Sequence, residues 1–113
     1  MEARLAASVL ATSLMRRCES LGGFAAVINK GDPTAGSILV ILTEKGGNQR
    51  LLERVLQADG AYSWQAISSQ DIEQEQEFAK LLERRRSFDP DIWLIELDVP
   101  SAERFAAEMN SSD

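Results

Sequence analysis

The stretch Leu81–Leu97, L-L-E-R-R-R-S-F-D-P-D-I-W-L-I-E-L, decides the fold because it joins a helical pattern to a strand pattern. Its first half pairs apolar residues at helical spacing with a closing triple arginine, and cations favour the negative end of a helix dipole. Pro90 then removes Asp89 from helical geometry. From Ile92 onward the run is apolar on both faces, which is typical of a covered strand. The stretch therefore predicts helix, turn and buried strand in that order.

The helix of this stretch begins well upstream. Ser69 or Asp71 is the predicted N-cap, and the helix runs to about Ser87. Its predicted buried side consists of Ile72, Phe78, Ala79, Leu81 and Leu82.

The remainder of the chain predicts one further helix, four further strands and a short C-terminal helix. The first helix covers residues 2–21, on an apolar stripe of Leu5, Val9, Thr12, Leu14, Met15, Cys18 and Leu21. The strands are Phe24 to Lys30, Ser37 to Thr43, Gln49 to Leu56 and Ala61 to Ile67. The first two suggest a hairpin, and the aliphatic S-I-L-V-I-L-T predicts a central strand. The pattern of Gln49 to Leu56 would also suit a short helix.

Ser101 starts the C-terminal helix around Phe105, and the residues from Asn110 to Asp113 are expected to fray. The prediction is one α+β domain over residues 1–113. It has a mostly antiparallel sheet of four to five strands, an N-terminal helix, a second helix before the last strand and a short C-terminal helix.

Composition excludes several function classes. The chain lacks histidine, which removes the usual general base and the commonest zinc ligand. The formal net charge is -6, so we do not expect nucleic acid as a partner. The single cysteine, Cys18, lies on the apolar stripe as a buried, inert thiol and allows no internal disulfide. The apolar run from Leu5 to Met15 is too short to span a membrane and lacks a cleavage site, so we expect a cytoplasmic protein.

The charged corner gives the candidate ligand-binding residues, Arg84, Arg85, Asp89 and Asp91. One or two of the arginines could clamp a phosphate or carboxylate. The aspartates, with Glu96 and Asp98 further along, could hold Mg²⁺. The alternative is structural, with a solvated helix end whose arginines pair with the aspartates around a turn.

Two other motifs have a structural and a functional interpretation. The loop G-D-P-T-A-G, Gly31 to Gly36, has the glycine spacing of a phosphate-binding loop but lacks its Lys and its following helix, which favours a structural turn. Tyr62 and Trp64 could stack a ligand ring, although two aromatics on one strand face more often pack. Trp93 is a predicted core residue whose indole N–H requires one buried acceptor. We expect no cofactor.

Several strings taken together resemble one bacterial family. They are Arg4-Leu5, Arg16-Arg17, Gly23 to Ala25, Gly31-Asp32, Ala35 to Val40 and Phe88 to Glu96. The chain is similar to the small proteins catalogued as domain-of-unknown-function family number fourteen ninety-one. The resemblance implies an α+β protein of the bacterial cytoplasm and brings no assigned activity, cofactor or catalytic residue.

The sequence favours a non-catalytic interaction or regulatory module whose partner is a second copy or another protein. Strands that are apolar on both faces in so short a chain require cover, which a partner could supply. An enzyme or binder of a small phosphorylated or carboxylated ligand, acting through Arg85, Asp89 and Asp91, is the alternative.

Overall fold

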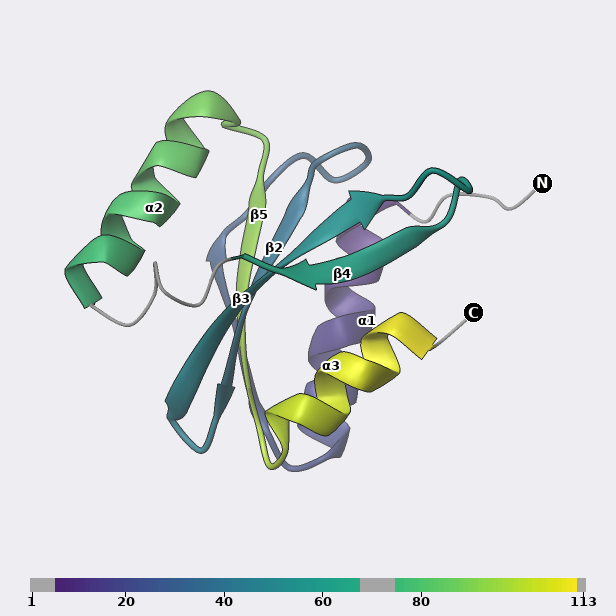
Figure 1. Ribbon diagram of the computed structural model, residues 1–113, viewed down its shortest axis with the longest axis vertical. Helices are drawn as coiled ribbons and strands as arrows, with labels where there is room; N and C mark the ends of the chain where they lie inside the picture. Colours follow the sequence, from purple (N-terminus) through teal and green to yellow (C-terminus); the bar gives the residue numbers. More distant parts are fainter. Residues whose placement is uncertain (1–5, 68–74, 112–113) are drawn as a thin grey trace.

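β-branched and aliphatic runs separated by glycine turns build a five-stranded sheet with helices on both faces (Figure 1). This computed structural model describes residues 6–67 and 75–111. The elements in chain order are α1 (Ala7–Ser20), β1 (Phe24–Asn29), β2 (Ile38–Glu44), β3 (Gly47–Leu56), β4 (Tyr62–Ala66), α2 (Glu75–Phe88), β5 (Trp93–Val99) and α3 (Ala102–Ser111). They confirm the predicted α+β class and show that the ambiguous third segment is a strand.

The strand order is β1-β5-β2-β3-β4, with β5 parallel to β2 and the other pairs antiparallel. The predicted hairpin between the first two strands is therefore wrong, because β5 lies between them. β5 buries Trp93, Ile95 and Leu97 on one face and Leu94 on the other, so it gains most from an interior position. The prediction of a central position for β2 is confirmed.

The larger core lies between the sheet and the pair α1 and α3, which cover the same face (Figure 1). The predicted stripe of α1 is partly wrong. The residues of α1 that the sheet buries are Ala7, Ala11, Leu14 and Cys18, whereas Val9 is 52% exposed. At about 100° per residue, Val9 lies about 200° around the helix from Ala7, on the side opposite the buried face.

A smaller core lies under α2 on the opposite face. Leu81 and Leu82 pack there against a cluster of sheet residues, Leu39, Ile41, Leu51, Ile92 and Leu94. Ala79, predicted to be buried, is exposed. The predicted cap residues Ser69 and Asp71, together with Ile72 and the side chain of Phe78, lie outside the part of the chain that the structure describes.

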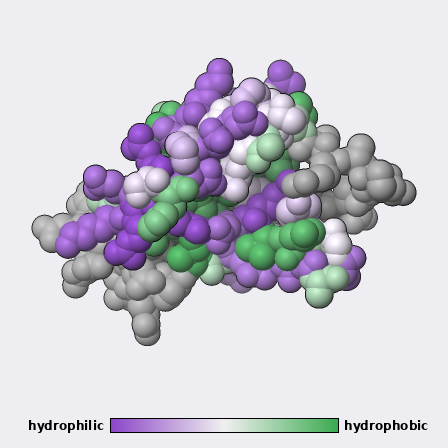
Figure 2. Space-filling view, turned by 90° about the horizontal axis from the view of Figure 1, so that it is seen from above, coloured by the Kyte–Doolittle hydropathy of each residue, from purple (hydrophilic) through white to green (hydrophobic). Residues whose placement is uncertain are grey.

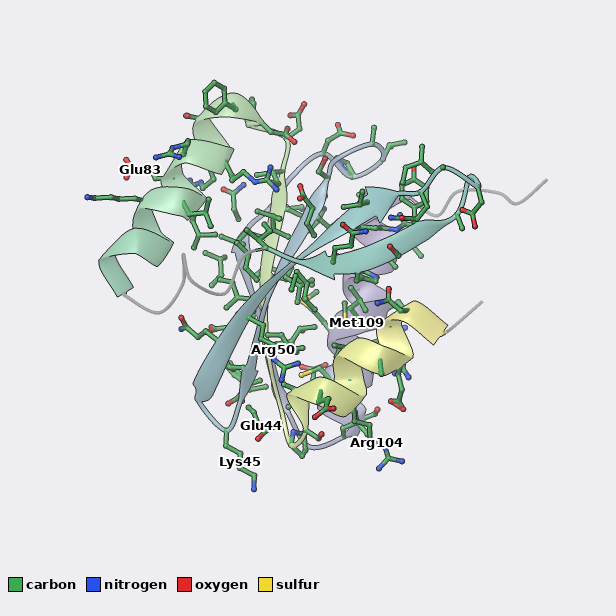
Figure 3. The ribbon with its side chains drawn as sticks, viewed as in Figure 1. Glu44, Lys45, Arg50, Glu83, Arg104 and Met109 are labelled. Carbon is green, nitrogen blue, oxygen red and sulfur yellow. The ribbon has the colours of Figure 1, made fainter. Side chains whose placement is uncertain are left out.

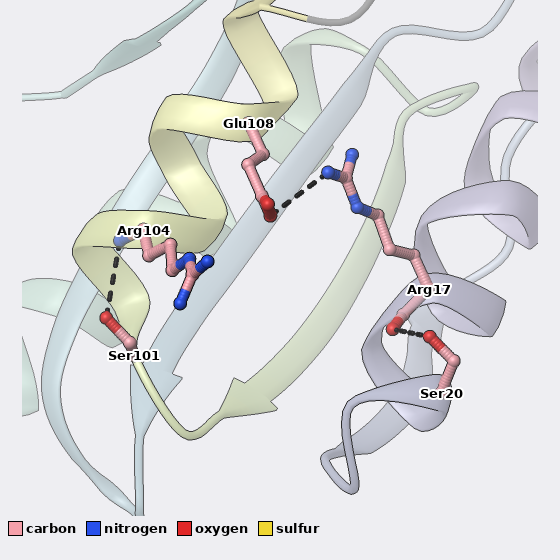
Figure 4. Close-up of polar contacts among 5 residues, drawn as sticks. All are labelled: Arg17, Ser20, Ser101, Arg104 and Glu108. Atoms are coloured by element: carbon pink, nitrogen blue, oxygen red, sulfur yellow. Dashed lines mark hydrogen bonds and ion pairs between the residues drawn. The ribbon is translucent and has the colours of Figure 1, made fainter.

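The C-terminal helix is anchored at both ends. The Glu44 carboxylate accepts the Ala102 N–H at 2.9 Å, and Figure 3 shows Glu44 beneath the first turn of α3. Ser101 Oγ, just before the helix, accepts the Arg104 N–H at 3.4 Å (Figure 4). Nearer the C-terminal end of α3, Glu108 pairs with Arg17 of α1 at 3.1 Å.

Asn110, the first residue of the segment expected to fray, contacts β4. The Asn110 side-chain amide accepts the Trp64 N–H at 2.6 Å and donates to the Trp64 carbonyl at 3.0 Å, which fastens α3 to β4. Among the described helices, none has the length and apolarity required to cross a membrane.

Candidate functional site

The two predicted arginines at the end of α2 lie in different surroundings. Arg85 forms an ion pair with Glu53 of β3, and each side chain is 34% exposed. Within the described residues, Arg85 Nε is buried without a hydrogen-bond partner. Arg84 is exposed, and its carbonyl accepts the Ser87 hydroxyl at 2.9 Å. Arg85 thus pairs with the sheet, and not with Asp89 or Asp91 as the structural alternative predicted.

The two aspartates of the corner form a turn. Asp89 Oδ1 accepts the Asp91 N–H at 3.2 Å, and the Asp91 side chain is exposed. Across residues 6–67 and 75–111, no group of three His, Cys, Asp or Glu side chains could hold a metal ion. Seen from this end of the molecule, the surface is largely hydrophilic with separate apolar groups (Figure 2). The structure therefore does not bring Arg84, Arg85, Asp89 and Asp91 together around one point.

The turn after α2 instead forms a clasp with the Gly31–Gly36 loop. The Asp32 N–H donates to the Asp91 carbonyl at 3.0 Å. The Trp93 indole N–H donates to the Asp32 carbonyl at 2.7 Å, which confirms its predicted need for one acceptor. A Cβ at Gly31 would lie 2.2 Å from the Asp91 carbonyl oxygen, so the two backbones meet where only glycine fits.

The same loop caps α1. The Ala7 N–H donates to the Thr34 carbonyl at 3.1 Å, and the Ser8 N–H donates to the Pro33 carbonyl at 2.9 Å. Asp32 Oδ2 accepts the Thr34 N–H at 3.0 Å and the Ala35 N–H at 2.7 Å, as predicted for this turn. The loop carbonyls therefore accept hydrogen bonds from two N–H groups in the first turn of α1. Those N–H groups are not available to bind a phosphate, which supports the structural interpretation of this loop.

The aromatic pair on β4 has separate roles. Trp64 is buried in the larger core, as its packed interpretation predicted. Tyr62 lies under Arg54, whose guanidinium carbon is 4.1 Å from the ring centroid. The two rings therefore do not form one stacking platform.

Cys18 is buried, as predicted. Its thiol lies within hydrogen-bond distance of two backbone oxygens, 3.3 Å from Phe24 and 3.4 Å from Asp98. Burial raises the pKa of the Cys18 thiol, and this outweighs the lowering effect of the Asp98 carbonyl. A raised pKa keeps the sulfur protonated at neutral pH, so it is a poor nucleophile.

Sequence reasoning missed the exposed apolar edge of the sheet. β1 is the outer strand beside β5, and Phe24, Val27 and Ile28 are 59%, 43% and 51% exposed. Phe24 lies opposite Asp98 and Val27 lies opposite Ile95, so the two side chains project from opposite faces. The signal was the uncharged string F-A-A-V-I-N, which the predicted hairpin paired with the strand Ser37 to Thr43.

Sequence reasoning also missed the polar half of the sheet face that α2 partly covers. The apolar cover from α2 ends at Ile41 and Leu94, and beyond them Thr43, Glu96 and Asp98 share the same face. The alternation I-E-L-D in β5 was the signal for this surface.

These features define a small α+β protein whose most distinctive sequence strings hold the fold together. The family comparison matches residues 5–107 to the family described as protein of unknown function (DUF1491), and the chain belongs to that family. The match confirms the resemblance that the sequence suggested. A search of curated proteins finds no match.

Solved structures of related proteins share the fold. A crystal structure of a DUF1491 family protein from Caulobacter crescentus CB15 is 33% identical, with a TM-score of 0.77 over 90% of this chain and 94% of that one. An NMR structure of a DUF1491 family protein from Caulobacter crescentus CB15 is 30% identical, with a TM-score of 0.78 over 93% and 94%. A solution structure from A. tumefaciens is 28% identical, with a TM-score of 0.75 over 98% and 99%.

Proposed function

We propose that this chain is a non-catalytic interaction module that pairs with a second copy of itself through the outer edge of β1. The observation that carries the proposal is the exposure of Phe24, Val27 and Ile28 on an edge strand. Natural edge strands are usually protected by lysine, proline or inward charges, and residues 24–29 contain none of these. A bulge between Val27 and Asn29 breaks the register at one end only, so Phe24 to Val27 is left regular.

A second copy fits this edge for two reasons. Antiparallel pairing of two β1 strands about a twofold axis places the same uncharged surface on both sides. Because residues 24–29 carry no charge, two copies that each have a net charge of -6 can approach there without bringing carboxylates together. One strand pair buries less area than most stable interfaces, so the expected dimer is weak and depends on concentration.

Sedimentation velocity over a concentration series tests the proposal. We expect the wild type to shift from monomer to dimer, and we expect Val27→Lys to remain monomeric because two lysines would face each other at the edge. Val9→Lys is the matched control, because Val9 is also exposed but lies on α1. A wild type that stays monomeric at the highest concentration would refute the proposal, as would equal dimerisation of the two variants.

The alternative, a small-ligand site at Arg84, Arg85, Asp89 and Asp91, stays a prediction. Of these side chains, the contacts described above give structural partners to Arg85 and Asp89. A thermal-shift screen with divalent metals, nucleotides and small anions tests the alternative directly. A shift that Asp91→Asn and Arg85→Ala abolish would support it.

A further inference from the structure

The corner between the C-terminal end of α2 and the end of β1 forms an open pocket of about 380 Å³. It is lined by Asn29 of β1, by Glu83, Arg86 and Ser87 of α2, and by Pro90 of the turn that follows. Glu83 and Arg86 carry opposite charges and the other described lining residues are uncharged, so the pocket suits a neutral group. A cavity of roughly 150 Å³ is enough to hold benzene, so an aromatic ring fits in this space.

Phe24 carries an exposed aromatic ring at the other end of β1. It lies opposite Asp98 of β5, and alternation along β5 places Asp98 on the same face as Leu94, which packs under α2. The Phe24 side chain, 59% exposed, therefore projects from the face that carries the pocket. Asn29 is five residues further along β1, roughly 16 Å at about 3.3 Å per residue, so Phe24 does not reach the pocket of its own copy.

The proposed pairing of two β1 strands removes this separation, and the inference rests on that pairing. A twofold axis perpendicular to the sheet reverses the strand and keeps the α2 face of both copies on the same side. When the axis passes through Ala26, Phe24 of one copy lies opposite Ile28 of the other, one residue from Asn29. This register is favoured because it places an aromatic residue opposite a β-branched one and leaves the small Ala26 opposite itself.

The charges around the two ends of β1 are complementary. Arg84 and Arg86 are exposed at the end of α2, where Arg86 shares the pocket with Asn29. Asp98 lies beside Phe24 at the other end, on the same face. Reversing the strand therefore brings the basic end of α2 in each copy alongside the acidic part of the sheet face in the other, which favours this orientation over others.

We propose that each pocket receives the Phe24 ring of the second copy. Pro90 supplies an apolar wall, and the Arg86 guanidinium offers a cation to the face of the ring. The twofold axis produces two such contacts, one on each side of the paired strands. Aromatic rings that fill pockets contribute much of the affinity of protein interfaces, so the two rings anchor a strand pair that is otherwise small.

Isotope-filtered NOEs in a sample that mixes labelled and unlabelled protein test this contact. We expect NOEs from the Phe24 ring protons of one copy to Ser87 and Pro90 of the other. Contacts between the two β1 strands without these ring contacts would leave the pairing in place and overturn the assignment of the pocket. The absence of all contacts between copies would overturn both.

The dimer Kd from sedimentation velocity measures the contribution of the ring. We expect Phe24→Ala to raise the Kd about a hundredfold, because each dimer loses two rings at roughly tenfold each. Leu56→Ala is the matched control, since Leu56 is 57% exposed but lies on β3, and it is expected to leave the Kd unchanged. Equal effects of the two variants would overturn the proposal.

A charge reversal at the pocket tests its other side. We expect Arg86→Glu to raise the Kd about tenfold, and to have a smaller effect in a Phe24→Ala background because Arg86 and the ring are in contact. Arg104→Glu makes the same charge change on α3 (Figure 3) and is expected to leave the Kd unchanged. An equal effect of Arg104→Glu, or strict additivity of Arg86→Glu with Phe24→Ala, would place the ring outside the pocket and overturn the inference.

Discussion

The clasp between the Gly31–Gly36 loop and the turn after α2 can be broken with one methyl group. In Gly31→Ala, the new Cβ would lie 2.2 Å from the Asp91 carbonyl oxygen and 2.8 Å from the Ile92 carbonyl oxygen. Ordinary C···O contacts are about 3.3 Å or longer, so the two backbones must separate by roughly 1 Å. That movement would break the bonds that Asp32 N–H and the Asn29 side chain make to these oxygens at 3.0 and 2.8 Å.

Each broken hydrogen bond costs about 1 kcal/mol, and more where a buried group is left without a partner. We therefore expect Gly31→Ala to lower the free energy of unfolding by about 2–4 kcal/mol. Urea denaturation followed by the fluorescence of Trp93 and Trp64 measures this loss, because both indoles are buried.

Gly47→Ala is the matched control. Its Cβ would meet only the Glu44 carbonyl, at an ordinary 3.8 Å, so we expect a change of less than about 0.5 kcal/mol. A Gly31→Ala protein as stable as the wild type would refute the account of the clasp. A Gly47→Ala protein destabilised to the same extent would do so as well.

Three further predictions concern contacts that hold the fold. Asn110→Ala is expected to lower the free energy of unfolding by about 1–3 kcal/mol, because two bonds to the Trp64 backbone are lost, and urea denaturation measures it. A double-mutant cycle on Arg85 and Glu53 is expected to give a coupling of about 0.5–1 kcal/mol, since both side chains are partly exposed, and the coupling should fall in high salt. Burial raises the pKa of the Cys18 thiol above its ordinary value of 9.0, so the thiol contributes stability that is fully present below pH 9.0 and is lost as pH rises through the folded-state pKa. In alkaline urea titrations, the stability of the wild type should therefore fall more steeply with pH than that of Cys18→Ala.

Each of these predictions has a contradicting result. An Asn110→Ala protein with wild-type stability would mean that α3 does not depend on its bond to β4. A coupling free energy near zero would mean that the Arg85–Glu53 ion pair does not stabilise the fold. Parallel pH profiles of the wild type and Cys18→Ala would show that burial does not raise the thiol pKa.

The elements of this fold could be predicted from the sequence because their signals are local. Local patterns located every described strand, although the pattern of Gln49 to Leu56 also suited a short helix, and Pro90 correctly marked the turn before β5. The pairing of the strands could not be predicted in the same way. A short loop favours a hairpin between β1 and β2, but β5, which is buried on both faces, lies between them. This pairing depends on contacts between segments far apart in the sequence, so local patterns do not reveal it.

The candidate site shows the same limit. The charges from Arg84 to Asp91 are neighbours in sequence, which suggested mutual pairing, but Arg85 pairs with Glu53, 32 positions away. The polar half of the sheet face combines Thr43 of β2 with Glu96 and Asp98 of β5, and their alignment depends on register. Only the alternation of Glu96 and Asp98 with apolar residues gave a local signal for it.

Contacts between two copies of β1 provide the most direct test of the proposed pairing. A mixed sample of isotope-labelled and unlabelled protein allows isotope-filtered NOEs to report only contacts between copies. We expect backbone contacts from Ala26 and Val27 of the labelled copy to β1 of the unlabelled copy, in an antiparallel pattern. A protein that remains monomeric at NMR concentrations, or a dimer whose contacts lie on another surface, would contradict it.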